Sequence, residues 1–214
     1  MIKVIIVEDH VLVRSGLANI IDRAGDMRVV GEASSGEQAL RLNLELEPDI
    51  VLMDIGLPGM SGVEATERIL RRRPAARVIG LTARSRQPYP LRLLDSGASG
   101  YLTKGCDAEE LLRAVRDVAG GKRYIGAEIA QQLASAMLPG GETACPFSEL
   151  TSRELEVALM LARGLKPRAI AERIHISPKT VSTHKYRIYE KLGVRSEVDL
   201  LRAAIRHEVL PAEE

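Results

Sequence analysis

Residues 51–62 read VLMDIGLPGMSG, and this stretch decides the fold class. With Ile50 in front of it, the apolar run IVLM is continuous rather than alternating, which is typical of a strand buried on both faces of a parallel sheet. The run ends at Asp54, and a turn rich in glycine and proline follows. Ser61 and Glu64 then form a capping-box pattern, which predicts the start of a helix.

The same succession of apolar run, turn and amphipathic helix pattern repeats over residues 1–120. Such alternation indicates a parallel sheet with crossover helices. The predicted strands are Lys3–Val7, Val29–Ala33, Asp49–Met53, Arg77–Leu81 and Gly100–Thr103. Five such units predict an α/β domain of the flavodoxin-like kind, a doubly wound five-stranded parallel sheet.

The helices between these strands carry recognisable start signals. Ser35, Ser61 and Asp107 are predicted N-caps of the second, third and fifth helices. The fourth helix is poorly defined, because Pro88 and Pro90 exclude a helix interior before about Tyr89–Leu91. The first helix is expected to turn one apolar stripe toward the core, made of Val13, Leu17, Ile20 and Ile21.

Residues 121–147 are predicted to form a linker that contains a short helix, Ala127–Met137, and a stretch rich in proline and glycine. Strand patterns are absent from Phe147 onward, and residues 148–214 predict an all-α domain of four short helices. Their start signals are a capping box at Thr151 and N-terminal residues at Pro167, Ser177 and Ser196.

Charge is unevenly distributed along the 214 residues. The net charge is only +1, yet residues 163–195 contain nine Lys or Arg against two Glu, a local +7 that leaves −6 for the remainder. A basic block in a nearly neutral chain indicates contact with a polyanion. The two cysteines are too few for a disulfide framework or zinc site. The N-terminus lacks a signal-peptide pattern and no segment reaches about 20 apolar residues, so we expect a cytoplasmic protein without membrane contact.

Chemistry-bearing side chains follow the predicted strands at the edge where doubly wound sheets bind ligands. They are Glu8 and Asp9 after the first strand, Asp54 after the third, Thr82 after the fourth and Lys104 after the fifth. Converging carboxylates need a cation, and hard oxygen ligands favour Mg²⁺, with the Gly56 carbonyl as a further ligand. Asp54 is then a nucleophile toward phosphorus, and Lys104 and Thr82 can neutralise and bind the phosphoryl oxygens. Each residue alone has an ordinary alternative as a helix cap or surface group.

The motifs VIIVEDH, VLMDIGLPGMSG, VIGLTA and GYLTK resemble the receiver domains of two-component response regulators over residues 1–120. The resemblance implies Asp54 as the phosphoacceptor, with Asp9 and Asp54 as direct Mg²⁺ ligands and Glu8 in the same pocket. It also implies Thr82 and Lys104 as phosphate readers and Tyr101 as the aromatic residue that follows Thr82. Gly56 departs from the larger residue often found at its position, which leaves the lifetime of the phosphoryl group open.

Two helix patterns of the second domain are separated only by the turn Ile176–Ser177. This spacing predicts a helix-turn-helix whose second helix, 178–192, enters the major groove of double-stranded DNA. Val181, Ile188 and Leu192 fall on its inward face. The residues expected at DNA are Lys179, Thr180, Ser182, Thr183, Lys185, Tyr186 and Arg187, with the cations at phosphates and Ser182, Thr183 and Tyr186 at base edges.

LTSRELEVALMLARGLKPRAIAERIHISPKTVSTHKYRIYEKLGV resembles the LuxR-type helix-turn-helix domain. Together with the receiver it resembles the NarL/FixJ class of response regulators. RYIGAEIAQQLA and LLRAAIRHEVL extend the similarity to the GacA/UvrY subgroup of global regulators. The subgroup implies a BarA/GacS-like sensor histidine kinase as partner, no turnover of a separate substrate, and promoters of small regulatory RNAs as targets.

Two rival functions are a Mg²⁺-dependent phosphatase, which would need a general acid and a cap over the substrate, and an adaptor whose helical domain binds protein. Two surfaces are also predicted. The kinase is expected to dock on the first helix, at Val11, Arg14, Ser15 and Ala18. A homodimer, formed on phosphorylation or DNA binding, is expected to pair through Val198, Leu201 and Ile205 of the last helix; alternatively, that stripe is buried against Leu155 and Leu159.

Overall fold

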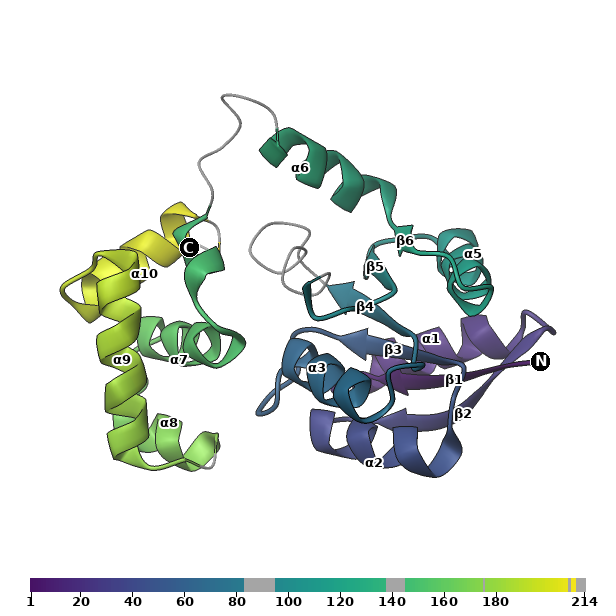
Figure 1. The fold of residues 1–214 in the computed structure, drawn as a ribbon, viewed down its shortest axis with the longest axis horizontal. Coiled ribbons are helices and arrows are strands. Elements are labelled where there is room, and N and C mark those ends of the chain that lie inside the picture. The colour runs from purple at the N-terminus through teal and green to yellow at the C-terminus, as the bar shows by residue number, and fades with distance from the viewer. Residues whose placement is uncertain (83–94, 138–144, 175, 208, 211–214) are drawn as a thin grey trace. The chain divides into compact units, whose positions relative to one another are not determined.

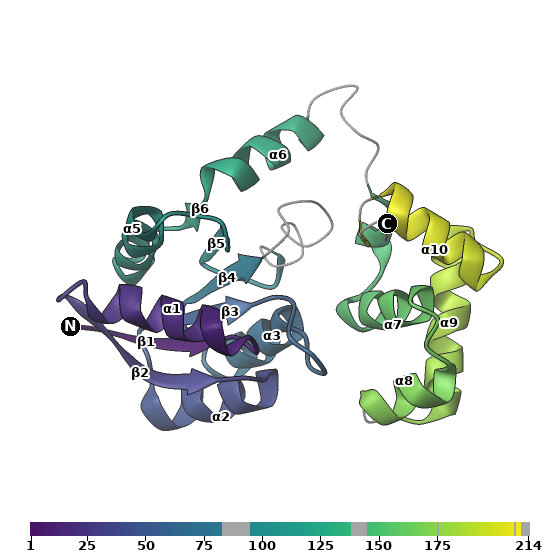
Figure 2. The same ribbon diagram turned by 180° about the vertical axis from the view of Figure 1, so that it is seen from behind.

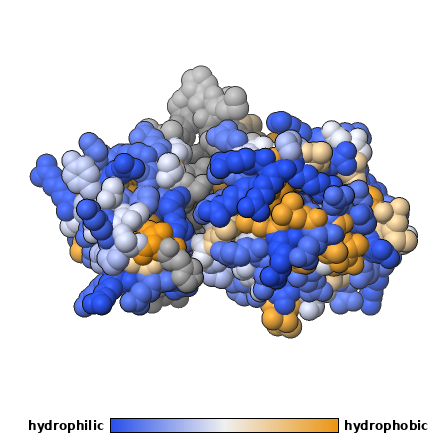
Figure 3. Space-filling model, turned by 60° about the horizontal axis from the view of Figure 1, so that its bottom comes forward, coloured by the Kyte–Doolittle hydropathy of each residue, from blue (hydrophilic) through white to orange (hydrophobic). Residues whose placement is uncertain are grey.

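The computed structural model describes residues 1–82, 95–137, 145–174, 176–207 and 209–210 of the chain. Its described residues form two compact units, one from Met1 to Ser135 and the other from Ala136 to Leu210. The face drawn in Figure 3 shows a larger apolar area on the first unit than on the second. No helix in the described ranges is long and apolar enough to cross a membrane.

The first unit is built on one parallel sheet (Figure 1). Within the described residues the sheet has six strands in the order β2-β1-β3-β4-β5-β6, and every neighbouring pair is parallel. The strands are β1 (Ile2–Val7), β2 (Met27–Ala33), β3 (Ile50–Asp54), β4 (Val78–Thr82), β5 (Gly100–Thr103) and β6 (Tyr124–Ile125). The predicted doubly wound parallel sheet is confirmed. The sixth strand, β6, was not predicted and lies in the segment assigned to the linker.

Helices cover both faces of this sheet (Figures 1 and 2). Helices α1 (Val11–Asp22) and α5 (Ala108–Ala119) pack on one face, and α2 (Gly36–Leu46) and α3 (Gly62–Arg72) pack on the other. Alternate residues of β1 enter the two cores, Val4 and Ile6 on the α1 side and Ile5 and Val7 on the α2 side. The run VIIV is therefore continuous because each of its residues is buried on one face or the other.

The predicted caps of these helices are confirmed. The side chains of Ser35, Ser61 and Asp107 accept hydrogen bonds from backbone N–H groups in the first turns of α2, α3 and α5. The helix predicted from about Tyr89–Leu91 lies outside the described residues.

The segment after α5 is attached to the first unit. In β6, Tyr124 pairs with Gly100 and Ile125 with Tyr101, and the Gly126 N–H donates to the Tyr101 carbonyl at 2.9 Å. Helix α6 (Ala127–Met137) then places Ile129 in a fully buried position. The cluster around it, here called the Tyr101 cluster, consists of Ile55, Val63, Ala98, Tyr101 and Ile129.

The second unit is helical, as predicted. After a short 3-10 helix at Pro146–Glu149, its described helices are α7 (Ser152–Ala162), α8 (Pro167–Arg173), α9 (Pro178–Leu192) and α10 (Glu197–Arg206). Thr151 and Glu154 form both halves of a capping box, and Ser177 and Ser196 cap α9 and α10. Gly193 ends α9 with φ of 65°, a conformation that favours glycine. The buried core is contributed by residues such as Phe147, Leu155, Ile170, Val181, Ile188 and Leu200.

Candidate functional site

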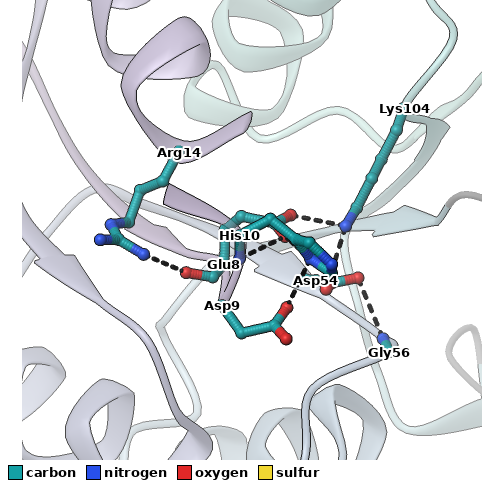
Figure 4. Close-up of polar contacts among 7 residues, drawn as sticks. All are labelled: Glu8, Asp9, His10, Arg14, Asp54, Gly56 and Lys104. Carbon is teal, nitrogen blue, oxygen red and sulfur yellow. Dashed lines mark hydrogen bonds and ion pairs between the residues drawn. The ribbon is translucent and has the colours of Figure 1, made fainter. Parts of the chain in front are cut away.

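An acidic pocket lies at the carboxyl ends of β1, β3 and β5 (Figure 4). Asp54 is the last residue of β3 and is only 3% exposed, while Glu8 follows β1 and is fully buried. Lys104 follows β5, and its Nζ lies 2.6 Å from Glu8 Oε2 and 3.0 Å from Asp54 Oδ2. The sheet topology thus brings together three residues that are far apart in the sequence, as the strand-end pattern predicts.

The environment of Asp54 combines burial with two favourable partners. Its Oδ1 accepts a hydrogen bond from the Gly56 N–H at 3.0 Å, and Lys104 contacts Oδ2. Burial dominates and raises the pKa of Asp54, although both partners favour the charged carboxylate. Burial opposes the charge of Lys104 as well, but contacts with Glu8 and Asp54 outweigh it and raise the pKa of Lys104. Lys104 therefore stays protonated beside a desolvated carboxylate.

His10 is a pocket residue that the sequence did not single out. Its Nδ1 lies 3.0 Å from Glu8 Oε1 and 2.9 Å from Asp9 Oδ1, and hydrogen bonding to Glu8 together with the charge of Asp9 raises the pKa of His10. Within the described ranges, potential ligand atoms of Glu8, Asp9 and His10 lie within 4.8 Å of one another. The sequence feature that could have identified His10 is its position directly after the two acids.

The donor set of this pocket fits a hard divalent cation. Carboxylate oxygens of Glu8 and Asp9 lie within 4.8 Å of each other, and Lys104 bridges Glu8 to Asp54 as a single positive charge. Carboxylate oxygens are the ligands that Mg²⁺ prefers. The predicted ligand set of Glu8, Asp9, Asp54 and the Gly56 carbonyl stays a prediction.

Thr82 and Tyr101 occupy neighbouring strands beside the pocket. Thr82 ends β4 and is buried, and its carbonyl accepts the Lys104 N–H at 2.6 Å. Tyr101, on β5, is fully buried in the Tyr101 cluster, where it shares its surroundings with Ile129 of α6. Tyr101, the aromatic residue predicted to follow Thr82, and Ile129 of the linker helix therefore lie in one apolar cluster.

Gly62 sets how closely α3 approaches Asp54. A Cβ atom at this position would overlap the Asp54 carbonyl oxygen and lie 2.8 Å from the Asp54 carbonyl carbon and from Ile55 Cα. Only a residue without a side chain lets the first turn of α3 pack against the backbone that carries Asp54. The sequence placed Gly62 in a capping box and gave no sign of this contact.

The docking face predicted on α1 is only partly present. Val11 and Ser15 are exposed, but Ala18 packs against the core, so its predicted exposure is wrong. Arg14 is also less accessible than predicted, because its side chain is only 17% exposed and bonds to neighbouring residues. Val13, predicted to face the core, is 37% exposed. Leu12, at 88% exposed, adds an apolar residue to this end of the helix.

In the second unit, α9 presents most of the predicted DNA-contacting residues to solvent. The exposed ones are Lys179, Thr180, Ser182, Thr183, Tyr186 and Arg187, with Tyr186 at 70%. Lys185 is only partly exposed, because its Nζ lies 2.8 Å from Glu197 Oε1 of α10 and 5.4 Å from the centre of the Tyr189 ring. The hydroxyls of Ser182 and Thr183 donate to carbonyls of their own helix, each at 3.1 Å.

An ion pair between a buried glutamate and a partly exposed lysine fixes the other end of α9. Lys191 Nζ lies 2.6 Å from Glu154 Oε2 and donates to the Glu149 carbonyl at 3.1 Å. Burial would raise the pKa of Glu154, but Lys191 and the Thr151 N–H outweigh it and lower that pKa. The capping box of α7 thus also anchors the helix that carries the exposed basic residues.

Helix α10 leaves part of the stripe predicted for self-pairing accessible. Leu200 and Ala204 are its buried residues, so Leu201 does not belong to the core stripe and is 36% exposed. Val198 is exposed as well, and Ile205 is half-buried. Two of the three residues predicted for self-pairing are therefore accessible, and their role stays a prediction.

The chain belongs to the response regulators of two-component systems. Residues 4–116 match the family described as "Response regulator receiver domain", and residues 148–204 match "Bacterial regulatory proteins, luxR family". The resemblance predicted from the motifs is confirmed in both domains. A receiver joined to a LuxR-type DNA-binding domain makes this chain a regulator of transcription.

Its relatives include regulators of the predicted subgroup. The response regulator GacA of Pseudomonas aeruginosa is 44% identical over 212 residues, covering 99% of each chain. The response regulator UvrY of Escherichia coli K12 is 41% identical over 213 residues, covering 100% of this chain and 98% of UvrY. Among solved structures, the response regulator ChrA of a heme-sensing two-component system is 33% identical with a TM-score of 0.55, covering 98% of each chain.

Proposed function

We propose that Asp54 accepts a phosphoryl group from a sensor histidine kinase and that this modification controls DNA binding by α9. The observation that carries the proposal is the Lys104 ammonium held between Asp54 and Glu8 at 3.0 and 2.6 Å in a buried pocket. A desolvated carboxylate next to a fixed cation is arranged for attack on phosphorus, because the incoming oxygens bring negative charge.

The transfer forms one bond and breaks one. An Asp54 oxygen attacks phosphorus, and the phosphorus–nitrogen bond of a phosphohistidine breaks. The phosphohistidine carries a proton on its other ring nitrogen, so the ring leaves as neutral imidazole. Lys104 then exchanges its carboxylate contacts for a phosphoryl oxygen, and the Thr82 hydroxyl donates to another. Glu8, Asp9, Asp54 and the Gly56 carbonyl would hold Mg²⁺, whose charge would offset that of the carboxylates and the phosphoryl group. The phosphoryl group is retained as a signal, and no separate substrate is turned over.

The signal is proposed to pass from Thr82 and Lys104 to Tyr101. Phosphorylation biases an equilibrium between two receiver conformations by contacts that only the phosphoryl group makes. The active form is a homodimer that pairs through Val198, Leu201 and Ile205 and places two α9 helices on double-stranded DNA, where two half-sites add their binding free energies. Acting on chromosomal DNA places the protein in the cytoplasm.

For the kinase, we propose a BarA/GacS-like sensor, in keeping with the GacA relative. The accessible start of α1, with Val11, Leu12 and Ser15, adjoins Glu8 and Asp9 and suits a transient interface. Serine substitutions at Val11 and Leu12 should slow transfer from the cognate kinase and spare labelling by a small phosphodonor. Equal loss of both activities would exclude docking at this place.

The phosphoacceptor is tested by incubating the chain with a small phosphodonor, with and without EDTA. Asp54→Asn should abolish the label, and EDTA should suppress labelling of the wild type. Asp117→Asn is the matched control, because Asp117 lies on α5, outside the pocket, and pairs with Lys122 in the loop after that helix. Label that survives in Asp54→Asn, or is indifferent to EDTA, would refute the proposal.

A further inference from the structure

Glu8 and Asp9 lie in a short turn whose backbone is held from two sides. Strand β1 ends at Val7 and α1 begins at Val11, so the acids stand in a three-residue connection. The Glu8 N–H donates to the Ala33 carbonyl of β2 at 2.9 Å. The Glu8 carbonyl accepts a hydrogen bond from Arg14 Nη1 at 2.7 Å (Figure 4).

The second of these bonds controls both acids at once. The Glu8 carbonyl belongs to the peptide unit that joins Glu8 to Asp9, and this unit is planar. The Cα atoms of Glu8 and Asp9 both lie in this peptide plane. A hydrogen bond that fixes the direction of the carbonyl therefore also limits the directions of the two side chains. Without Arg14, this plane could rotate while β1 and α1 stayed in place.

Arg14 is itself oriented by Glu32. Its Nε lies 3.0 Å from Glu32 Oε2, and Glu32 immediately precedes Ala33 on β2. A guanidinium group holds its N–H donors in a rigid planar fork, so the bond to Glu32 directs Nη1 toward the Glu8 carbonyl. The Glu32 side chain is almost half exposed, and such a pair contributes little to stability, on the order of 0–1 kcal/mol. The role of the Arg14–Glu32 pair is therefore to orient the Arg14 guanidinium group.

We propose that Arg14, oriented by Glu32, is a positioning residue that aims Glu8 and Asp9 at the divalent cation. The inference rests on the proposed function, because it concerns the cation that the phosphoacceptor site is proposed to hold. This role also explains why the Arg14 side chain is mostly buried, although the other residues in the first turn of α1 are exposed.

The sign of the effect separates positioning from simple electrostatics. Arg14 carries a positive charge close to the pocket, so on charge alone its removal would tighten the binding of a cation. Positioning predicts the opposite, because carboxylates that lose their fixed direction bind the metal more weakly. Loss of a group that orients metal ligands typically costs 10- to 100-fold in metal affinity.

The test measures Mg²⁺ binding to the unphosphorylated full chain by calorimetry, together with the melting temperature without Mg²⁺. Arg14→Gln should raise the Mg²⁺ dissociation constant by about 10-fold and Glu32→Gln by about 3-fold, with little change in melting temperature. Arg116→Gln is the matched control, because Arg116 makes a two-bond ion pair with Asp26, at 2.7 and 3.1 Å, that does not touch the turn. This control should bind Mg²⁺ like the wild type.

Unchanged or tighter Mg²⁺ binding by Arg14→Gln, with normal binding by the wild type, overturns this inference alone. The inference is also overturned if Arg116→Gln loses as much Mg²⁺ affinity as Arg14→Gln. A wild type that binds no Mg²⁺ overturns the proposed cation site and this inference with it.

Discussion

Replacing Ile129 by alanine should detach the linker segment from the receiver. Ile129 is fully buried in the Tyr101 cluster, although it belongs to α6, beyond the five predicted strands. Truncating a buried isoleucine to alanine costs about 2–5 kcal/mol, through lost apolar contact and the cavity that remains. A value of about 3 kcal/mol corresponds to a shift of about two orders of magnitude in the equilibrium between docked and undocked segment.

Hydrogen exchange of single backbone amides measures this equilibrium directly. The Gly126 N–H bonds to the Tyr101 carbonyl and the Ala130 N–H to the Gly126 carbonyl, both at 2.9 Å. Both amides should exchange about 100-fold faster in Ile129→Ala, whereas amides of β1 and β3 should keep their protection.

Ile125→Ala is the matched control, because it removes the same atoms from a residue of β6 that is exposed rather than buried. Protection at Gly126 should change little in this variant. Equal exchange in Ile129→Ala and Ile125→Ala would show that the buried contact does not hold the segment, and the reasoning from burial would fail.

Three further predictions follow from contacts described above. Gly62→Ala should cost about 1–3 kcal/mol in urea unfolding and impair labelling, because its Cβ meets backbone. Gly16→Ala, a helix glycine with open space around it, should instead stabilise slightly; equal effects would refute the steric argument. Glu154→Gln should lose about 2 kcal/mol near pH 7, less than a fully buried pair because its lysine partner is partly exposed. The pKa of Glu154 is lowered in the fold, so its contribution is complete above the ordinary value of 4.5 and is lost as pH falls through the folded pKa; a deficit independent of pH would contradict this. Lys179→Ala should weaken binding to specific and random duplexes alike and should reduce the slope of log affinity against log salt concentration by about one. Thr183→Ala should instead change which sequence is preferred. The reverse pattern in gel shifts would show that the predicted placement of α9 in the major groove is wrong.

The sequence predicted those parts of the fold that depend on local pattern. The runs VIIV and IVLM indicated β1 and β3, since a strand buried on both faces has no polar alternation. Strand β6 could not be predicted, because Tyr124 and Ile125 are too few for any periodicity. Their extended conformation comes from pairing with β5, which is a tertiary effect.

The face of α1 shows a second limit. A helical wheel treats all turns alike and assigned Val13 to the core and Ala18 to solvent. In the structure the packing against the core begins only with Leu17, so Val13 in the first turn is exposed, whereas Ala18 is small enough to pack closely. The point at which a helix first contacts the sheet depends on the conformation of the preceding turn. The apolar pattern of the helix gives no information about that conformation.

The site was predicted to the extent that the strand-end rule applies. It brought Glu8, Asp54 and Lys104 to one edge, and the structure joins them through ion pairs. Contacts that depend on tertiary folding could not be predicted from the sequence. Lys185 was assigned to phosphate contact by its charge, but the start of α10 brings Glu197 within 2.8 Å of it.

The attachment of β6 and α6 to the receiver also bears on how this protein can be divided or fused. A fragment that ends at residue 120 would make β5 an edge strand with one side unpaired and would uncover the apolar side chains around Tyr101. Exposed edges and apolar surface promote association between chains, so such a fragment is expected to aggregate. The first compact unit continues to Ser135. A fusion that joins this receiver to a different output domain should therefore keep the native chain through Ser135 and begin the foreign sequence beyond it.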